Sequence, residues 1–588
     1  MKKLLSGNEA IALGAFESGV KFASGYPGTP STEILENLVK YDGIYCQWSP
    51  NEKTAFEAGI GASISGHRAL VTMKHVGVNV AADPLMTFSY TGVKGGFILI
   101  CADDPDLHSS QNEQDSRNYA KFAKVPMLEP SNSAEAKLMI IAGFEISEQF
   151  DTPVLIRTTT RLSHTRTVVE EGPKQEIKIK PGFEKNPKKY VMVPAFGKLR
   201  HKFVEERLIN LSLYNSSSNL NRILKAEKDA AKNSKIGIIT SGVAFNYVKE
   251  VIKNIDILKL GMIYPLPENT IKKFCESKDT IIVIEELDGF IEEELLKLRL
   301  KLDIKGKSVF PKTGELTQDK IYSLFYNKPI ERTESLPIEI PPRPPVLCAG
   351  CSHRAAYSVL KKKNLIITGD IGCYTLGALE PLNSLDTCIC MGAGIGTAIG
   401  MVKTNPEYAN KIAAVIGDST FIHSGITSII DALYNKAPIT TIIFDNRITA
   451  MTGHQDHPGT GKTLSGESTT AIDYKKLVIG ANYPENCVDC ANPLNTKLFS
   501  EIVDKHLNLN QPSVIIAQSP CALLNKKGKP VYFMIDKEKC VQCGKCIDTG
   551  CPAIMKKDGI ISIYKDGCRA CGLCVQCCEY NAIKSVKF

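Results

Sequence analysis

Residues 412–446 have the sequence IAAVIGDSTFIHSGITSIIDALYNKAPITTIIFDN, which contains two short apolar runs with a helical length of chain between them. Short apolar runs that alternate with helices predict parallel strands joined in a βαβ unit. The first run ends in Gly-Asp-Ser and the second in Asp-Asn, so polar residues follow both strands. Open α/β sheets bind ligands at the carboxyl ends of neighbouring strands. The stretch therefore predicts an α/β fold with a ligand site that includes Asp418 and Asn446.

The residue types at this site suit a divalent cation and a diphosphate. The carboxylate of Asp418, the amide oxygen of Asn446 and the backbone carbonyl of Ile448 are oxygen ligands of the kind that Mg²⁺ prefers. The helix that follows the first strand would direct its amide groups at the phosphates. The pattern resembles the thiamine diphosphate motif, with Ser419 and Asp445 in place of a usual glycine and asparagine. The resemblance implies five cofactor-binding residues in this domain: Gly417, Asp418, Ser419, Asn446 and Ile448.

The composition predicts a globular protein of several domains. The chain has 588 residues, of which 43% are hydrophobic and 23% charged, and this length predicts about three to five domains. A net charge of +8 spread over the chain argues against a dedicated nucleic-acid binder. The start, MKKLLSGNEA, turns polar too early for a signal peptide, and no apolar run approaches the roughly 18 residues that span a membrane. We therefore expect a cytoplasmic location, with neither nucleic acid nor membrane as a partner.

Nine of the twenty cysteines lie in the last 49 residues. Clustered cysteines in a large cytoplasmic chain indicate metal sites rather than disulfides. Two Cys-x2-Cys-x2-Cys triplets, each followed by a more distant cysteine, resemble the two-cluster bacterial ferredoxins, in which each fourth ligand reaches the other [4Fe–4S] cluster. A pair of zinc knuckles is the alternative. The predicted ligands are a first tail quartet, Cys540, Cys543, Cys546 and Cys578, and a second tail quartet, Cys551, Cys568, Cys571 and Cys574.

A glutamate near the N-terminus would complete a thiamine site. Thiamine enzymes use a glutamate from a second domain to hydrogen-bond the aminopyrimidine ring. Residues 51–70 place Glu52 at the head of a predicted helix with small residues that allow close approach, and this segment resembles the glutamate segment of such enzymes. Glu57 is the second candidate. The alternative is that both are solvated helix charges.

Several stretches together resemble the large, alpha subunits of the indolepyruvate:ferredoxin oxidoreductase family, in the 2-oxoacid:ferredoxin oxidoreductase superfamily, over essentially the whole chain. Besides the cysteine tail, they are YPGTPSTEI (26–34), MKHVGVNVAADPL (73–85), SSQNEQDSR (109–117), RPPVLCAGCSHR (343–354), GDIGCYTLG (369–377) and DNRITAMTGHQ (445–455).

The resemblance implies oxidative decarboxylation of aryl pyruvates with CoA to an aryl-acetyl-CoA and CO2, with reduction of ferredoxin. It also implies thiamine diphosphate with Mg²⁺, and a smaller beta subunit as partner. Glu52 would act on the cofactor, and Thr29 and Arg117 match the positions that meet the substrate carboxylate. A surface salt bridge is the alternative for Arg117. Other 2-oxoacids, non-oxidative decarboxylation and a purely electron-transferring scaffold remain alternative functions.

Four further cysteines form what we call the upstream quartet: Cys348, Cys351, Cys373 and Cys521. Their layout resembles that of the cluster nearest thiamine in related oxidoreductases, which motivates the hypothesis of a third [4Fe–4S] cluster. Four buried free thiols are the alternative.

The expected fold is a multidomain α/β thiamine-dependent fold, with two thiamine-binding Rossmann-like domains, a transketolase C-terminal-like domain and a C-terminal two-cluster ferredoxin domain. The expected order is a pyrimidine-binding domain (1–167), a charged linker with a solvated helix and loop (168–234), the transketolase C-terminal-like domain (235–335), the diphosphate-binding domain (336–530) and the ferredoxin-like domain (531–588).

Overall fold

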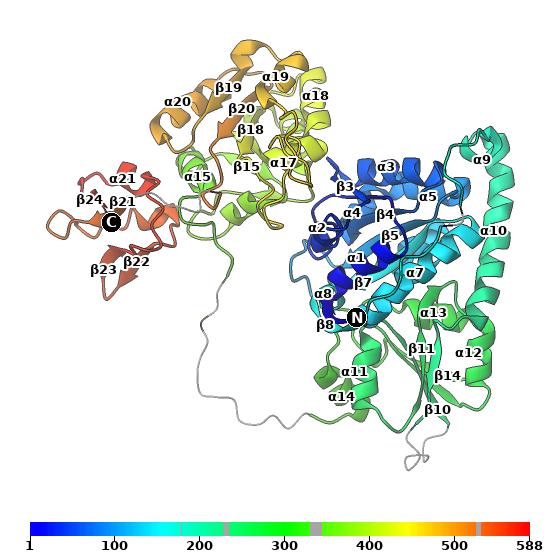
Figure 1. Ribbon diagram of the computed structural model, residues 1–588. Helices are drawn as coiled ribbons and strands as arrows, with labels where there is room; N and C mark the ends of the chain where they lie inside the picture. The colour runs from blue at the N-terminus through cyan, green and yellow to red at the C-terminus, as the bar shows by residue number, and fades with distance from the viewer. Residues whose placement is uncertain (178, 227–234, 330–340, 342–343, 525–530, 588) are drawn as a thin grey trace. The chain divides into compact units, whose positions relative to one another are not determined.

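The computed structural model describes residues 1–587 apart from 178, 227–234, 330–340, 342–343 and 525–530. The chain forms two compact units, Met1–Ile338 and Glu339–Phe588, which are described separately (Figure 1). Within the described ranges, no helix has both the length and the apolar character needed to cross a membrane.

The first unit contains a seven-stranded sheet that is parallel except for one edge strand. Its central strands are buried along their whole length, as expected of parallel strands that are covered on both faces. In sheet order the strands are β12 (Met262–Tyr264), β6 (Met127–Leu128), β7 (Val154–Thr159), β5 (Phe97–Asp103), β4 (Ala69–Lys74), β2 (Phe22–Gly25) and β3 (Tyr45–Trp48).

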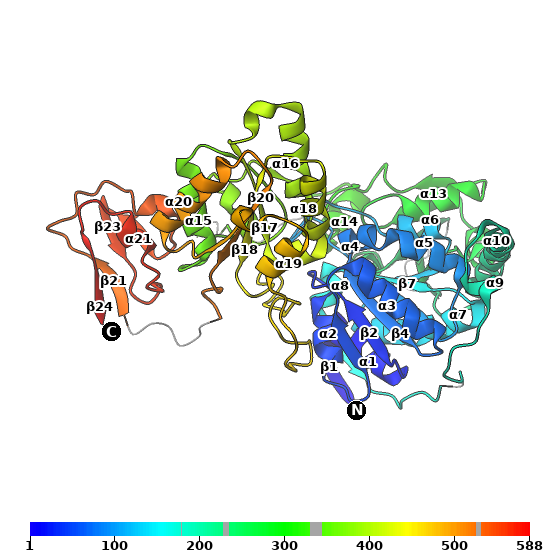
Figure 2. The same cartoon turned by 90° about the horizontal axis from the view of Figure 1, so that it is seen from above.

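Helices cover both faces of this sheet (Figure 1; Figure 2). Val71 and Leu99 share a core with the helices on one face, whereas Ile98 faces the other helix layer, where Gly143 allows close approach. The first layer holds α3 (Glu52–Ile64), α4 (His75–Val80) and α5 (Ala82–Thr91), and the second holds α1 (Gly7–Glu17) and α7 (Ser133–Phe150). The shorter helices of this region are α2 (Thr32–Leu38), α6 (Arg117–Ala123) and α8 (Thr160–His164).

The segment that we expected to be a free linker packs onto the first unit. Strand β8 (Arg166–Glu170) crosses the predicted boundary at residue 167 and pairs with β1 (Lys2–Ser6). After the short helix α9 (Pro187–Tyr190), α10 (Pro194–Ser217) was expected to be solvated, but it has a buried face. Arg207 on that face donates to the carbonyls of Ser89 and Asp151. Buried backbone carbonyls need such donors, so this segment is part of the folded unit.

A five-stranded sheet follows, and the chain passes from it into the seven-stranded sheet. Strand β11 ends at Leu260 and β12 begins at Met262, so Gly261 alone separates strands of different sheets. In sheet order the strands are β14 (Asp303–Lys305), β13 (Thr280–Ile284), β10 (Ile236–Ser241), β11 (Asp256–Leu260) and the antiparallel β9 (Arg222–Leu224). The flanking helices are α11 (Ala244–Val251), α12 (Glu268–Cys275), α13 (Phe290–Lys297) and α14 (Gln318–Tyr326).

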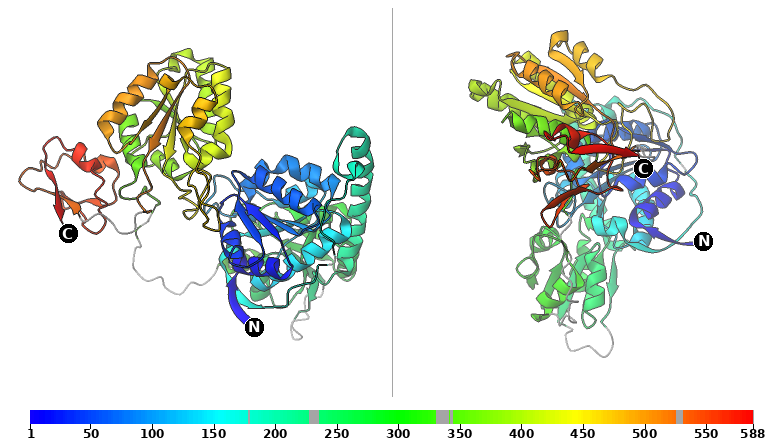
Figure 3. Two further views of the ribbon diagram at one scale, coloured as in Figure 1. Left: turned by 45° about the horizontal axis from the view of Figure 1, so that its top comes forward. Right: turned by 90° about the vertical axis from the view of Figure 1, so that its left-hand side faces the viewer.

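The second unit is built on a six-stranded, fully parallel sheet between two helix layers (Figure 3). Its strands in order are β16 (Thr387–Cys388), β15 (Ile366–Gly369), β17 (Ile412–Gly417), β18 (Thr440–Asp445), β20 (Ser513–Gln518) and β19 (Val488–Ala491). One layer holds α16 (Ala393–Thr404), α18 (Ile426–Tyr434) and α19 (Tyr474–Gly480), and the other holds α15 (Ser352–Lys362) and α20 (Thr496–Leu507).

The βαβ unit predicted from residues 412–446 is therefore correct. Strands β17 and β18 are neighbours and run parallel, with Gly417 opposite Phe444. Along β17, Ala414 packs in one core and Ala413 in the other, because successive side chains of a strand point to opposite faces.

The tail beyond residue 530 has little regular structure. It contains two antiparallel strand pairs and one short helix: β21 (Val531–Ile535) with β24 (Ile583–Lys587), β22 (Ile554–Lys557) with β23 (Ile560–Ile563), and α21 (Leu573–Gln576). The side-chain amide of Gln576 donates to the Leu494 carbonyl and accepts from Thr496 Oγ1, which ties the tail to α20. The predicted domain boundaries at 335/336 and 530/531 fall in or next to segments outside the described residues.

Candidate functional site

The predicted cation ligands lie together at the carboxyl edge of the six-stranded sheet. Asp418 directly follows β17, and Asn446 directly follows β18. The Arg447 amide donates to Asp418 Oδ2 at 2.8 Å, and the Ile448 amide donates to Asn446 Oδ1 at 3.2 Å. The loop after β18 thus folds around the Asp418 carboxylate.

The charge distribution at this edge suits a bound cation. Asp445 is buried, and both burial and the neighbouring Asp418 carboxylate raise its pKa to about 6. A divalent cation would relieve the repulsion between these two carboxylates. Gly417 lies against the Tyr374 ring, where an added Cβ would come within 2.7 Å of a ring carbon. Ser419 donates its amide to Asp418 Oδ1. The residues present therefore fit a cation held by carboxylate and amide oxygens.

Two histidines that we did not predict line the same edge. His457 Nε2 lies 3.3 Å from Asp418 Oδ2, and His353 Nε2 lies 3.4 Å from the Asn446 side-chain nitrogen. His353 is buried and stacks on Phe444, and burial lowers its pKa to about 4. It is therefore neutral at physiological pH. His353 lies within the motif at residues 343–354, and His457 lies two residues after the motif at residues 445–455. Nothing in either segment indicated that these histidines would lie beside Asp418 and Asn446.

A buried acid that we did not predict follows the third strand of this edge. Asp370 comes directly after β15 and accepts a hydrogen bond from the Tyr374 hydroxyl. Burial raises the pKa of Asp370 to about 8. A group with this pKa can hold or release a proton near neutral pH.

In the first unit, the two candidate glutamates have different environments. Glu52 is the first residue of α3, is 5% exposed and lies against Gly77, where an added Cβ would come within 2.7 Å of its side chain. The Asn51 side chain caps this helix by accepting from the Thr54 amide. Glu57 is exposed and pairs with Lys53 along the helix surface. Of the two, only Glu52 has the burial that a cofactor-contacting residue needs.

Thr29 lies in a half-buried turn of the first unit. Asn8 holds this turn by donating to the Pro30 carbonyl at 2.7 Å. The neighbouring Gly28 lies against Lys74, because an added Cβ there would be 3.2 Å from Lys74 Cβ. Lys74 donates to the Ser109 carbonyl, and burial lowers its pKa to about 8. Lys74 is thus the basic side chain beside the Thr29 turn.

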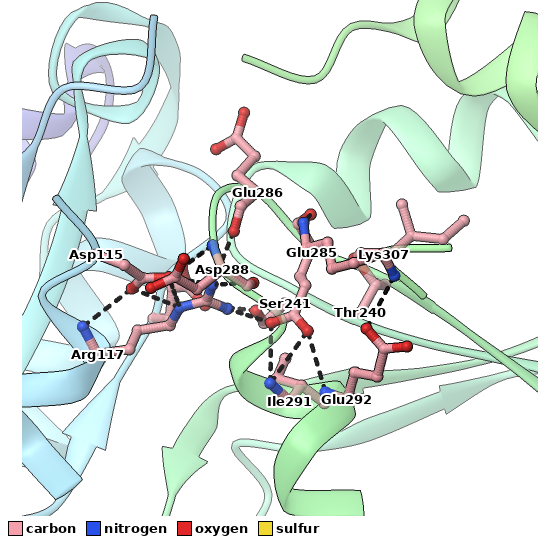
Figure 4. A network of polar contacts seen from close by, with 12 residues as sticks. Asp115, Arg117, Thr240, Ser241, Glu285, Glu286, Asp288, Ile291, Glu292 and Lys307 are labelled. Atoms are coloured by element: carbon pink, nitrogen blue, oxygen red, sulfur yellow. Dashed lines mark hydrogen bonds and ion pairs between the residues drawn. The ribbon is translucent and has the colours of Figure 1, made fainter. Parts of the chain in front are cut away.

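Arg117 forms a buried ion pair and not the surface salt bridge that was one of its two interpretations. Its side chain is 1% exposed, so it forms no surface salt bridge. Figure 4 shows its guanidinium between Asp115 and Glu285, with contacts of 2.5 Å to each carboxylate. Its Nη2 also donates to the backbone carbonyls of Glu286 and Asp288. Its Nε donates to Asp115 as well, so all three guanidinium nitrogens are engaged, and the arginine links α6 to the segment that follows β13.

The tail cysteines gather as the predicted quartets. All four members of the first tail quartet line one cavity, which Cys577 lines as well, and all four members of the second tail quartet line another. The thiols of Cys546 and Cys574 have pKa values raised to about 11 and about 12, chiefly by burial. A metal centre would favour their thiolate forms.

The upstream quartet also shares one cavity, of about 110 Å³. His353, Asn446 and His454 line it as well, so it adjoins the sheet edge that carries the predicted cation ligands. Burial raises the pKa of Cys351 to about 11 and that of Cys373 to about 12. These cysteines come from three separate segments, and their convergence on one cavity was not fixed by local spacing.

Comparisons with known proteins agree with this geometry. Residues 13–202 match the family model "Pyruvate flavodoxin/ferredoxin oxidoreductase, thiamine diP-bdg", and residues 370–517 match "Thiamine pyrophosphate enzyme, C-terminal TPP binding domain". The chain is 39% identical over 624 residues to "Indolepyruvate oxidoreductase subunit IorA" of Archaeoglobus fulgidus, covering 100% of this chain and 98% of the relative.

Two further relatives match the chain over different shares of its length. The subunit of the same name from Methanothermobacter marburgensis is 40% identical over 609 residues, covering 99% of this chain and 97% of the relative. "2-oxoglutarate synthase subunit KorA" of Archaeoglobus fulgidus is 25% identical, covering 52% of this chain and 94% of the relative. The resemblance inferred from the motifs is confirmed: the chain belongs to the indolepyruvate oxidoreductase subunit IorA family of thiamine diphosphate-dependent 2-oxoacid:ferredoxin oxidoreductases.

Proposed function

We propose that this chain, together with a smaller beta subunit, oxidatively decarboxylates aryl pyruvates, including indolepyruvate. CoA takes up the product as an aryl-acetyl-CoA, CO2 is released, and ferredoxin receives the electrons. The observation that carries the proposal is the combination within one unit of a cation-binding strand edge and three cysteine quartets, each around its own cavity. The relatives named for indolepyruvate support the substrate class.

Each part of the first site has a proposed role. Asp418, Asn446 and the Ile448 carbonyl would hold Mg²⁺ and, through it, the cofactor diphosphate. The cofactor, when bound, supplies the carbon nucleophile for decarboxylation. Glu52 would hydrogen-bond its aminopyrimidine ring. Thr29 would meet the substrate carboxylate.

Lys74 takes the role that we first assigned to Arg117. A substrate carboxylate needs a cation nearby, and the Arg117 guanidinium is already paired with two carboxylates. Among the described residues Lys74 donates to the Ser109 carbonyl, has the Asp104 carboxylate nearby and lies beside the Thr29 turn. A carboxylate near the ammonium would also favour its charged form and offset the effect of burial.

The cysteine quartets would carry the electrons. Oxidation of one 2-oxoacid with CoA releases CO2 and two electrons, and each [4Fe–4S] cluster accepts one at a time. The two tail quartets would hold two clusters and the upstream quartet a third. Ferredoxin-type potentials near about −400 mV require a donor as reducing as a decarboxylating 2-oxoacid.

The two alternative functions make different demands on these residues. Non-oxidative decarboxylation moves no net electrons and needs no cysteine quartet. An electron-transfer scaffold needs no cation site at Asp418 and Asn446 and no buried Glu52. Bound thiamine diphosphate near zero after anaerobic reconstitution would favour the scaffold.

The activity test uses the chain co-expressed anaerobically with its smaller subunit. Ferredoxin reduction is followed over a panel of indolepyruvate, phenylpyruvate, a branched-chain 2-oxoacid and pyruvate, each with and without CoA. We expect CoA-dependent reduction that is fastest with the aryl pyruvates. Glu52→Gln should abolish it while the matched surface variant Glu57→Gln does not. A preference for pyruvate, or equal loss in both variants, would contradict the proposal.

The third cluster has its own test. Cys521→Ala removes one member of the upstream quartet, and the exposed Cys490 provides the control variant Cys490→Ala. We expect about four fewer iron atoms per chain in the first variant and none lost in the second. An unchanged iron content in Cys521→Ala would contradict the hypothesis of an upstream cluster but not that of the two tail clusters.

A further inference from the structure

The upstream quartet and the second tail quartet approach each other at the start of α15. Gly350 lies between Cys348 and Cys351 of the upstream quartet, and an added Cβ would be 2.8 Å from the Cβ of Arg569. Arg569 in turn lies between two cysteines of the second tail quartet. The same added atom would be 3.3 Å from the Ala522 Cβ, next to the fourth upstream cysteine. The ligand loops of these two quartets are therefore in van der Waals contact.

Arg354 lies at this junction. It follows Cys351 by three residues, in the first turn of α15, yet its side chain lines the cavity of the second tail quartet. It is 1% exposed and is among the largest fully buried side chains of the described residues. The diphosphate-binding region thus contributes a side chain to a cavity that is otherwise formed mostly by the tail.

The guanidinium of Arg354 has buried N–H donors without a hydrogen-bond partner among the described residues. Among the described residues, Nη1 donates to the Thr549 carbonyl at 3.4 Å, which is long for an N–H···O bond. Nε and Nη2 are buried and have no hydrogen-bond partner among the described residues. A buried, always-charged group without a counter-charge is strongly unfavourable. Such a group implies an anionic partner in the cavity that it lines.

A cluster bound by four thiolates is an anion of this kind. The thiolates carry more negative charge than the iron–sulfur core carries positive charge, and reduction by one electron adds one more negative charge. Hydrogen bonds to the sulfur atoms and nearby charge set the potentials of such clusters. The amides of Phe533 and Ala570 already donate to Cys568 Sγ at 3.5 Å. Arg354 would add a full positive charge to these backbone dipoles.

We propose that Arg354 is a positioning residue that donates to the cluster of the second tail quartet, stabilises its reduced form and so makes it the first tail cluster to accept an electron. The inference rests on the proposed function, because it requires the clusters. The upstream quartet would hold the donor of one electron and the second tail quartet its acceptor, so that the first centre would be oxidised as the second is reduced. No proton would move, because the Arg354 guanidinium stays charged. The first tail quartet would hold the next acceptor.

The test measures reduction potentials, which a purely structural arginine would leave unchanged. Full-length protein with its smaller subunit is purified anaerobically, and each cluster is titrated by its paramagnetic signal. The signal lost in Cys551→Ala identifies the second tail cluster. In Arg354→Met we expect its reduction equilibrium constant to fall at least tenfold, which is about 59 mV for a one-electron couple. The cluster of the first tail quartet should keep its potential, whereas the upstream cluster can also shift, because the Arg354 charge acts on Cys351 as well.

Arg569→Met is the matched control. Arg569 lines the same cavity but is exposed, so water screens its charge. Its loss should change the reduction equilibrium constant of the second tail cluster by less than twofold. If Arg354→Met loses iron, Arg354→Lys and Arg354→Gln decide, and the potential should fall in the glutamine variant more than in the lysine variant. If Arg354→Met or Arg354→Gln keeps its iron and the second tail cluster keeps the wild-type potential, the proposed role of Arg354 is wrong, but the proposed function is not affected. Wild-type protein without tail iron overturns the proposed function as well.

Discussion

Replacing Arg117 with methionine tests whether this arginine is structural. The substitution keeps an unbranched side chain against Phe290, over which the guanidinium now lies, but it removes the counter-charge of Asp115 and Glu285. The Arg117 charge lowers the pKa of Asp115 against the effect of burial, whereas burial keeps the pKa of Glu285 raised in spite of it. Both carboxyl groups are 1% exposed, so neither can be solvated in compensation.

The expected cost follows from that burial. Removing one partner of a buried ion pair costs about 3–5 kcal/mol. At about 2 °C per kcal/mol for a domain of this size, calorimetry should show the first unit unfolding about 8 °C lower. Arg161→Met is the control, because Arg161 is 53% exposed in its pair with Glu315 and should cost less than about 1 kcal/mol. The KM for the 2-oxoacid should stay within twofold in folded Arg117→Met. A wild-type unfolding temperature with a KM raised tenfold or more would refute this reasoning and indicate that Arg117 binds the substrate.

Three further changes have defined outcomes. Burial raises the pKa of Glu286 to about 7, so the ionised carboxylate destabilises the folded state above that pH, and this penalty is lost as the pH falls toward the ordinary carboxyl pKa. Glu286→Gln should therefore stabilise the first unit by about 3 kcal/mol at pH 8 but by about 1 kcal/mol or less at pH 5. An equal gain at both pH values in denaturant unfolding would contradict the raised pKa. Gly350 has φ +80° and no room for a Cβ beside Arg569, so Gly350→Ala should reduce the iron content of both adjoining quartets, while full iron occupancy would show that the loops can separate. Asn51→Ala removes the cap of α3 and should lower the free energy of unfolding by about 1 kcal/mol. Turnover should fall too, because the first turn of α3, which carries Glu52, frays. An unchanged free energy of unfolding with unchanged turnover would show that the cap does not position Glu52.

Some of this architecture follows directly from local sequence. The βαβ unit at residues 412–446 was predictable, because period, length and flanking polar residues all lie within one continuous stretch. The tail quartets were predictable for a similar reason, since two-residue spacings let one loop contribute three ligands to one cavity. In these regions the local pattern specifies the neighbours almost completely.

Other features depend on contacts far apart in the chain. The environment of Arg117, which lies on α6, includes Glu285, which directly follows β13, and nothing around Arg117 in sequence indicates that carboxylate. His353 precedes Asp418 and Asn446 in the chain and His457 follows them, yet both histidines lie beside these two residues. The segment after residue 167 has a charged composition typical of a linker, but pairing of β8 with β1 outweighs that tendency. Tertiary contacts decide such cases, and they have no local sequence signature.

The single-residue crossing at Gly261 has a consequence for how the chain must be made. Strand β12 supplies the outer partner of β6, so the edge of the N-terminal sheet stays open until a segment more than a hundred residues later has left the ribosome. An unpaired strand edge invites association with other chains. The Gly261 carbonyl also accepts from the Glu129 amide, and an added Cβ would be 2.2 Å from the Leu220 carbonyl oxygen. A truncation that stops before this glycine should therefore aggregate, and a soluble fragment should extend at least through β12.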